Sequence, residues 1–328
     1  MIARVKLSMP ISLLLFLLLS AASQAENATP VVAYRSEPGV AFDRIIDTRT
    51  ADLCRKNSLA GARCLPPEDV LGPYRRMPNV SGLLWLLGSA GLRGDEHVLV
   101  VGDDRNRRDF IAGLLYLAGQ KRVLVLNTRI TGRTEYQTGA GSLRSRIRET
   151  VFVAPMRAER IVLRNELKAL IAGETPPVLL DGRSEEEYWG ADVRGTRGGH
   201  LPGAQHFPSD SIRRAAAGEI EFPRQSGDPI AYAHDGYEGL AYLARLAANG
   251  IESRLYLEGW SGWASDGTLP VDSASYPEPV VASENNSRQI PSEKLSEGGS
   301  SAAIVAAGGS FALLGFFLGR LTKNRGTG

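Results

Sequence analysis

Short apolar runs alternate with longer helix-forming runs through most of the chain. In the second half, "VLLD" at 178–181, "DPIAYA" at 228–233 and "SRLYLEGW" at 253–260 read as buried strands with helical segments between them. The first half repeats this order more faintly, with a strand in "FDRIIDTRTADLC" that ends at Asp47 and with strand, loop, helix and strand in "EHVLVVGDDRNRRDFIAGLLYLAGQKRVLVLN". Strands that alternate with helices predict an α/β fold with mainly parallel sheets, whose ligands bind beyond the carboxyl ends of the strands. We expect two such domains, over 38–135 and 161–272, joined by an inter-domain linker over 136–160.

The N-terminal pattern is that of an exported protein. Arg4 and Lys6 precede the apolar run "ISLLLFLLLSAA". The run is followed by "SQA", which ends at Ala25 and has small residues at the two positions that a signal peptidase reads. This order is typical of a cleaved secretory signal peptide, here over 1–25. The apolar run is short for a membrane-spanning helix, which needs about 20 apolar residues.

The C-terminal pattern is that of a membrane anchor. Residues 301–321 carry no charge before Arg320, which predicts one transmembrane helix, and the basic tail 322–328 should lie in the cytoplasm. The polar stretch 273–300, rich in Ser, Glu and Pro, predicts a flexible tether. We therefore expect a single-pass inner-membrane protein with its body in the periplasm, although a eukaryotic secretory route fits the same pattern. Two anchors could pair as a homodimer through the G-x-x-x-G step of Gly315 and Gly319.

The composition is that of a globular protein with no general affinity for polyanions. The 328 residues are 43% hydrophobic and 23% charged, with a net charge of +2. The sequence shows no dense basic tract, so nucleic acid is not an expected partner. The four histidines have no metal-ligand spacing, and we expect no metal and no cofactor.

Three motifs in the second half resemble the rhodanese (thiosulfate sulfurtransferase) family. Asp181 and Arg183 resemble its D-x-R, "GHLPGA" at 199–204 resembles G-H-I-P-G-A, and "LEGWSGWASDGTLPV" resembles its closing segment. The resemblance covers about Ile161 to Val271 and implies the tandem form of the family, because the first half repeats the D-x-R. Most matching residues also have a structural interpretation as hydrogen-bonding, turn or core residues. These framework residues are Asp181, Arg183, His200, Gly203 and Trp263.

The loop that carries the nucleophile in this family has no cysteine here. The resemblance implies a thiolate that attacks a sulfane sulfur and holds it as a persulfide, and the matching position is Ala233. Glu238 stands where the family has an arginine, so the loop also loses a positive charge. The candidate ligand-binding loop comprises His234, Asp235, Gly236, Tyr237 and Glu238.

The matching loop of the first half is also without a thiol. Asp103 occupies the nucleophile position, and Asp104, Arg105, Asn106, Arg107 and Arg108 form a secondary loop in which the arginines could bind an anion or an acidic partner. A solvated helix start explains these cations equally well. The two cysteines, Cys54 and Cys64, are disulfide candidates in an oxidising compartment, and a redox-active pair is the sharper alternative.

These observations favour a rhodanese-like protein that is exported, membrane-anchored and catalytically inactive. It would act as a binding or scaffold module for a protein partner in the same membrane or compartment. Two alternatives remain open at this point. One is a sulfurtransferase-like or phosphatase-like enzyme that uses His234 or Asp103, and the other is a redox role of the two cysteines.

Overall fold

The computed structural model describes residues 30–39, 42–72, 76–133, 136, 138–219 and 228–273. The predicted signal peptide, the tether beyond residue 273, the predicted transmembrane helix and the Gly315–Gly319 step lie outside these residues. Among the described residues, no helix combines the length and the apolar character needed to cross a membrane. All described elements lie within one compact unit, Met1–Tyr276.

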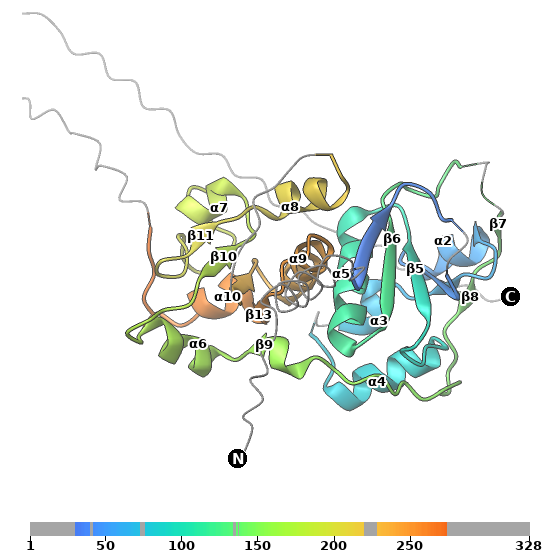
Figure 1. The fold of residues 1–328 in the computed structure, drawn as a ribbon, viewed down its shortest axis with the longest axis horizontal. Coiled ribbons are helices and arrows are strands. Elements are labelled where there is room, and N and C mark those ends of the chain that lie inside the picture. Colours follow the sequence, from blue (N-terminus) through green and yellow to red (C-terminus); the bar gives the residue numbers. More distant parts are fainter. Residues whose placement is uncertain are drawn as a thin grey trace, which may run out of the picture. The chain divides into compact units, whose positions relative to one another are not determined.

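The first sheet contains six parallel strands (Figure 1). Their order across the sheet is β1 (Val32–Arg35), β6 (Arg122–Leu126), β5 (His97–Val101), β2 (Arg44–Asp47), β4 (Arg63–Cys64) and β8 (Ser142–Leu143). β1 and β8 fall outside the expected range 38–135, so this sheet extends into both flanking segments. A short antiparallel pair joins β3 (Ser58–Leu59) to β7 (Thr138–Gly139).

Both faces of the first sheet are buried. Because neighbouring residues in a strand point to opposite faces, Val98 and Val100 pack into one core while Leu99 and Val101 pack into another. The first of these cores includes residues of α3 (Pro67–Leu71), α4 (Val80–Ser89) and α5 (Arg105–Ala118). α2 (Ala51–Lys56) contacts β3, β4 and β8. Burial on both faces explains the nearly continuous apolar runs of the strands.

The second sheet has five parallel strands. Their order is β11 (Gln205–His206), β10 (Leu179–Asp181), β12 (Ile230–Tyr232), β13 (Arg254–Tyr256) and β9 (Ile161–Val162). The described helices of this half are η1 (Ala158–Arg160), α6 (Arg164–Ile171), α7 (Glu185–Trp189), α8 (Ser209–Ala216), α9 (Gly236–Ala248) and α10 (Gly259–Ala264). The predicted α/β class with mainly parallel sheets is therefore confirmed.

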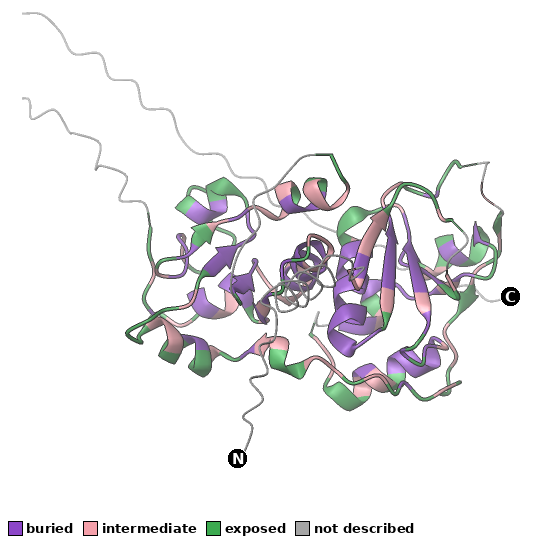
Figure 2. Cartoon of the chain, in the orientation of Figure 1, coloured by how far each residue is buried: buried purple, intermediate pink, exposed green. Residues whose placement is uncertain are grey.

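The two sheets are connected through α5 and α9, which pack against each other between them (Figures 1 and 2). Gly113 makes this approach feasible, because a Cβ at that position would lie 1.9 Å from the carbonyl oxygen of Leu240. The rings of Phe110 and Tyr237 stack with centroids 4.8 Å apart. Leu240 belongs to the same apolar core as the helices of the first sheet. One apolar core thus extends across both halves of the chain.

Candidate functional site

The loop after β12 is held by the segment that begins α10. The carbonyl oxygens of Ala233 and His234 accept hydrogen bonds from the N–H groups of Trp260 and Ser261, both at 2.8 Å. Gly259 has a φ of +61°, and a Cβ there would lie 2.7 Å from the same two carbonyl oxygens. The glycine is therefore required both by its backbone conformation and by the close approach of the loop. These backbone contacts fix the conformation of the loop. The side chain of Ala233, which is only 2% exposed, is no more than a methyl group.

The start of α9 is capped by the loop itself. Asp235 is the N-cap residue, and its Oδ1 accepts a hydrogen bond of 2.9 Å from the N–H of Glu238. A carboxylate beside the first turn also interacts favourably with the helix dipole. Asp235 was a candidate ligand residue, and the structure places it in the cap.

Charged side chains from two other segments surround Glu238. Its Oε1 lies 2.6 Å from Nη2 of Arg194, whose Nε lies 3.5 Å from Oε1 of Glu187. His234 Nδ1 lies 3.4 Å from the same oxygen of Glu187. Burial alone would raise the pKa of Glu187, but the contact with His234 and the charges of Arg194 and Arg183 outweigh burial and lower that pKa. Two carboxylates and one guanidinium thus stand around the loop.

Neither Glu187 nor Arg194 was predicted from the sequence. Glu187 lies in the acidic helix α7, and Arg194 lies in an irregular segment between α7 and β11. Arg194 and Glu238 are separated by 44 positions in the chain. An acidic residue at a position where the family has a cation was the one available signal for a compensating cation elsewhere.

A cavity of about 330 Å³ opens beside Ala233. Its lining includes Ala233, Ala241, Glu187 and Arg194 from the second half and Asn106 from α5 of the first half. The remaining lining residues are Gly182, Arg183, Ser184, Pro208, Ser209, Asp210, Glu238 and Arg245. The volume suits a small ligand or one inserted side chain. Both the candidate loop and the secondary loop contribute to this cavity.

The two D-x-R pairs adopt the same geometry in both halves. Nη2 of Arg183 lies 2.6 Å from Oδ2 of Asp181, and Nη2 of Arg49 lies 2.7 Å from Oδ2 of Asp47. All four side chains are buried. The Asp181–Arg183 pair is also tied to the sheet, because the Tyr232 hydroxyl donates to Asp181 Oδ2 at 2.5 Å. These residues form framework contacts.

The other framework residues are also engaged within the fold. His200 Nδ1 lies 2.9 Å from the carbonyl oxygen of Tyr188, and its ring stacks on that of Tyr188. Trp263 is fully buried and donates to the carbonyl oxygen of Pro270 at 2.8 Å. Gly203 has a φ of +71° in the turn before β11. The Arg183 Cζ lies 4.6 Å from the centroid of the Trp260 ring.

In the first half, Asp103 is turned toward the segment after β6. Its Oδ1 accepts from the N–H groups of Ile130 and Thr131, and its Oδ2 accepts from the Thr131 hydroxyl. Burial alone would raise the pKa of Asp103, but the hydrogen bonds from Thr131, the charge of Arg49 and the hydrogen bond from Ile130 outweigh it and lower that pKa. Asp103 is thus positioned to hold the segment after β6.

Most of the secondary loop is likewise engaged. Asp104 caps α5 by accepting from Arg107 N–H at 2.9 Å. The Arg107 guanidinium binds Glu68 at 2.6 and 2.7 Å, and buried Arg108 donates to three backbone carbonyl oxygens. The expectation that these two arginines could bind an external anion is therefore not supported by their geometry. Arg105 is exposed, and Asn106 Oδ1 accepts a bond of 2.6 Å from Arg245.

The predicted disulfide between Cys54 and Cys64 is confirmed. Both residues are at most 1% exposed, and a Cβ on Gly141 would lie 2.4 Å from the sulfur of Cys54. Such burial suits a structural bridge. Within the described ranges, no three His, Cys, Asp or Glu side chains are grouped as a metal site would require.

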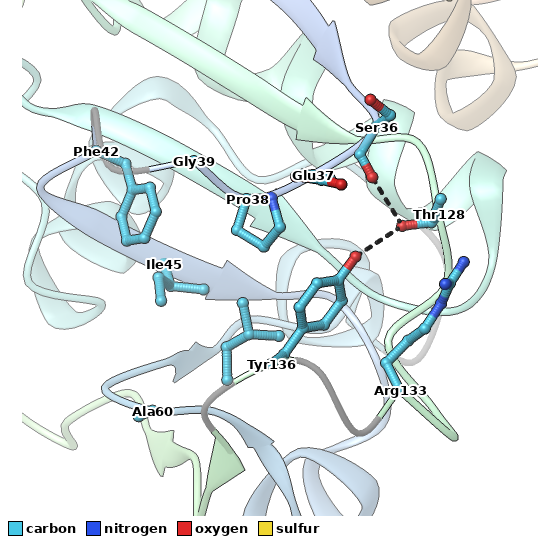
Figure 3. A pocket seen from close by; sticks show the side chains of 11 residues that line it. Ser36, Glu37, Pro38, Gly39, Phe42, Ile45, Ala60, Thr128, Arg133 and Tyr136 are labelled. Carbon is cyan, nitrogen blue, oxygen red and sulfur yellow. Dashed lines mark hydrogen bonds between the residues drawn. The ribbon is translucent and has the colours of Figure 1, made fainter.

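A separate cavity of about 780 Å³ lies in the first half (Figure 3). Phe42, Ile45 and Tyr136 line its apolar part. On the opposite rim, Thr128 Oγ1 lies 3.3 Å from the Tyr136 hydroxyl and 3.4 Å from the carbonyl oxygen of Ser36. None of the residues predicted from the sequence lines this cavity.

The fold and the loop after β12 define a rhodanese-like α/β protein. Residues 163–266 match the model of the rhodanese-like domain. The chain therefore contains a rhodanese-like domain over these residues.

Related proteins and structures agree with this assignment. The chain is 29% identical over 243 residues to "Putative thiosulfate sulfurtransferase SseB" of Mycobacterium tuberculosis, which covers 65% of this chain and 82% of that protein. A solved structure titled "Crystal Structure of Probable Thiosulfate Sulfurtransferase" is 24% identical with a TM-score of 0.51, and covers 73% of this chain and all of that one. The wild-type structure of EanB is 16% identical with a TM-score of 0.54, and covers 78% and 67% of the two chains. At these identities the solved structures show the fold alone.

Proposed function

We propose that this protein is a rhodanese-like binding module without persulfide-based sulfur transfer. One observation carries the proposal. Ala233 places a methyl group at the loop position that requires a thiolate, and the chain's only two cysteines are buried in a disulfide. A sulfur nucleophile is thus missing from the cavity that the fold provides.

The electrostatics of the loop support the same proposal. Thiosulfate and a bound persulfide are anionic, and the carboxylates of Glu187 and Glu238 stand beside Ala233 with Arg194 between them. Asp235 also places its own carboxylate at the helix start. Such an arrangement favours recognition of a partner group over the binding of a small anion.

The location belongs to the proposal as well. The sequence pattern of the two ends supports an exported protein that is anchored in the inner membrane, with the body in the periplasm. A partner in the same membrane or compartment would then bind at the cavity beside Ala233, because tethering confines both molecules to one surface. The burial of Cys54 and Cys64 supports a structural role for these residues rather than the redox alternative.

The test is sulfur transfer from thiosulfate to cyanide by a fragment of residues 26–276, which contains every described element. We expect no turnover by the native fragment. The double variant Ala233→Cys/Glu238→Arg should gain turnover, because it restores the thiolate and the cation that the family places in this loop. Ala233→Cys alone should gain less, since the Glu238 carboxylate remains.

The matched control is Ala241→Cys, which places a thiol in the same cavity but away from the loop. This variant should stay inactive. Turnover by the native fragment that disappears in His234→Ala would overturn the proposal and favour an enzyme with a non-cysteine loop.

A further inference from the structure

One face of the first domain combines exposed apolar side chains with several arginines. Trp85 of α4 is 41% exposed, and Ile147, Val151 and Val153 of the following chain are 73%, 52% and 65% exposed. Large apolar side chains that gather on a surface mark an interaction site, whereas scattered ones do not. The question is therefore whether these four residues share one face.

Hydrogen bonds place the segment 145–153 along α4 and its C-terminal end (Figures 1 and 2). Three backbone N–H groups of this segment donate to backbone carbonyl oxygens at or beyond the end of α4. The pairs are Ser145 to Ser89 at 2.8 Å, Thr150 to Gly88 at 3.3 Å and Val153 to Arg93 at 2.8 Å. A Cβ on Gly88 would lie only 2.3 Å from the Thr150 carbonyl oxygen, so the two segments are in direct contact. Trp85 precedes Gly88 and Ser89 by three and four positions, and such residues share one side of a helix. Trp85 thus lies on the side of α4 along which this segment runs.

A basic cavity of about 420 Å³ adjoins this apolar surface. Arg44, Arg63 and Arg93 line it together with Glu149 and Thr150. Glu149 is paired with Arg63 at 2.8 Å, and Arg93 Nε lies 3.8 Å from Asp95 Oδ1. The lining itself holds three arginines and one carboxylate, which gives the cavity a positive balance. Glu149 and Thr150 lie between Ile147 and Val151 in the chain, so the cavity adjoins the segment that carries these apolar residues.

Two further arginines extend the positive charge. Arg146 and Arg148 are exposed, and neither forms an ion pair within the part of the chain that the structure describes. They flank Ile147 in a segment without regular secondary structure, which bends at residues 146–147 and 149–150. We define the lipid-facing surface as Trp85, Ile147, Val151 and Val153 with Arg44, Arg93, Arg146 and Arg148.

We propose that the lipid-facing surface docks on an anionic phospholipid membrane, with a lipid phosphate in the basic cavity. Trp and aliphatic side chains insert at the level of the headgroups, while arginines bind phosphates and gain from the negative surface potential. The apolar residues are exposed on a helix and an irregular segment, which suits a fluid interface better than a complementary protein pocket. This contact would orient the body on a membrane, and it does not depend on the proposed role of Ala233.

The experiment measures binding of the 26–276 fragment, which lacks the predicted anchor, to vesicles of phosphatidylcholine with or without 30% phosphatidylglycerol. The native fragment should bind the anionic vesicles, and rising salt should weaken this binding because the arginines are exposed. Arg146→Glu/Arg148→Glu should lower the affinity about 30-fold or more, since each basic residue near an anionic surface contributes about fivefold. Ile147→Ser/Val151→Ser should weaken binding to a similar extent.

The matched control is Lys168→Glu/Arg214→Glu, which changes the charge equally on exposed helices of the second domain and should bind as the native fragment does. Thermal unfolding verifies that each variant is folded. Absence of binding to anionic vesicles would overturn the proposal. The proposal would also be overturned if vesicle binding were lost in the arginine variant and not in the Ile147→Ser/Val151→Ser variant. Calorimetric binding of inorganic phosphate without vesicle binding would likewise overturn it. Either result would indicate a site for a soluble anion.

Discussion

At the residue scale, Ala233 and Asp103, which occupy the matching loop position of the two halves, have different structural roles. Ala233 is a buried methyl group whose backbone is held by Trp260 and Ser261. Asp103 is hydrogen-bonded to the segment after β6. The sequence identified both as positions without a thiol, because that follows from residue type and motif alone. It could not show where the Asp103 side chain points, because its partner Thr131 lies 28 positions away.

The contacts of Asp103 predict a pH-dependent contribution to stability. Its pKa is lowered in the folded state, so Asp103 stabilises the fold above its ordinary pKa of 3.8, and this stabilisation is lost as the pH falls through the lowered value. We expect Asp103→Asn to reduce the free energy of unfolding at pH 7. This difference from the native fragment should shrink as the pH falls below 3.8. Urea unfolding between pH 2.5 and 7 tests this. A difference that stays constant with pH would contradict the assignment.

At the element scale, the strand, loop and helix around residue 233 could be predicted because the signals are local. β12 is a short apolar run, and Asp235 with Gly236 begins a helix rich in Ala and Leu. The extent of the first sheet was not predictable in the same way. β1 and β8 are short strands that are defined by their pairing with β6 and β4 rather than by their own composition. The pairing of Arg194 with Glu238 depends on an irregular segment that has no periodic pattern.

The cap of α9 gives a prediction at this scale. Asp235→Ala removes the acceptor for Glu238 N–H and one favourable charge at the helix start, so we expect a loss of about 1 kcal/mol in the free energy of unfolding. Asp235→Asn retains an acceptor and should recover most of this loss. Urea unfolding at neutral pH measures both variants. Equal destabilisation by the two changes would assign the effect to charge rather than to the hydrogen bond.

At the scale of the whole molecule, a buried ion pair joins the two halves. Arg245 Nε on α9 lies 2.8 Å from Asp109 Oδ2 on α5, and both residues are buried. Tyr34 of β1 donates to the other oxygen of Asp109 at 2.7 Å, and burial together with the Asp109 charge raises the pKa of Tyr34. Arg245 also lines the cavity beside Ala233. The contact that holds the halves together therefore forms part of the candidate site.

Removing one member of this pair should be costly because it leaves the other charge buried without a partner. We expect Arg245→Met to lower the free energy of unfolding by about 3 to 5 kcal/mol, and Arg245→Met/Asp109→Leu to recover a large part of that loss. Arg214→Met is the control, since the exposed Arg214–Glu219 pair should contribute less than about 1 kcal/mol. We expect the native fragment to unfold in one transition, and because Arg245 contacts both halves, Arg245→Met should give two transitions. A single transition with a small loss would mean that the apolar contact around Gly113 and Leu240 is sufficient to hold the halves together.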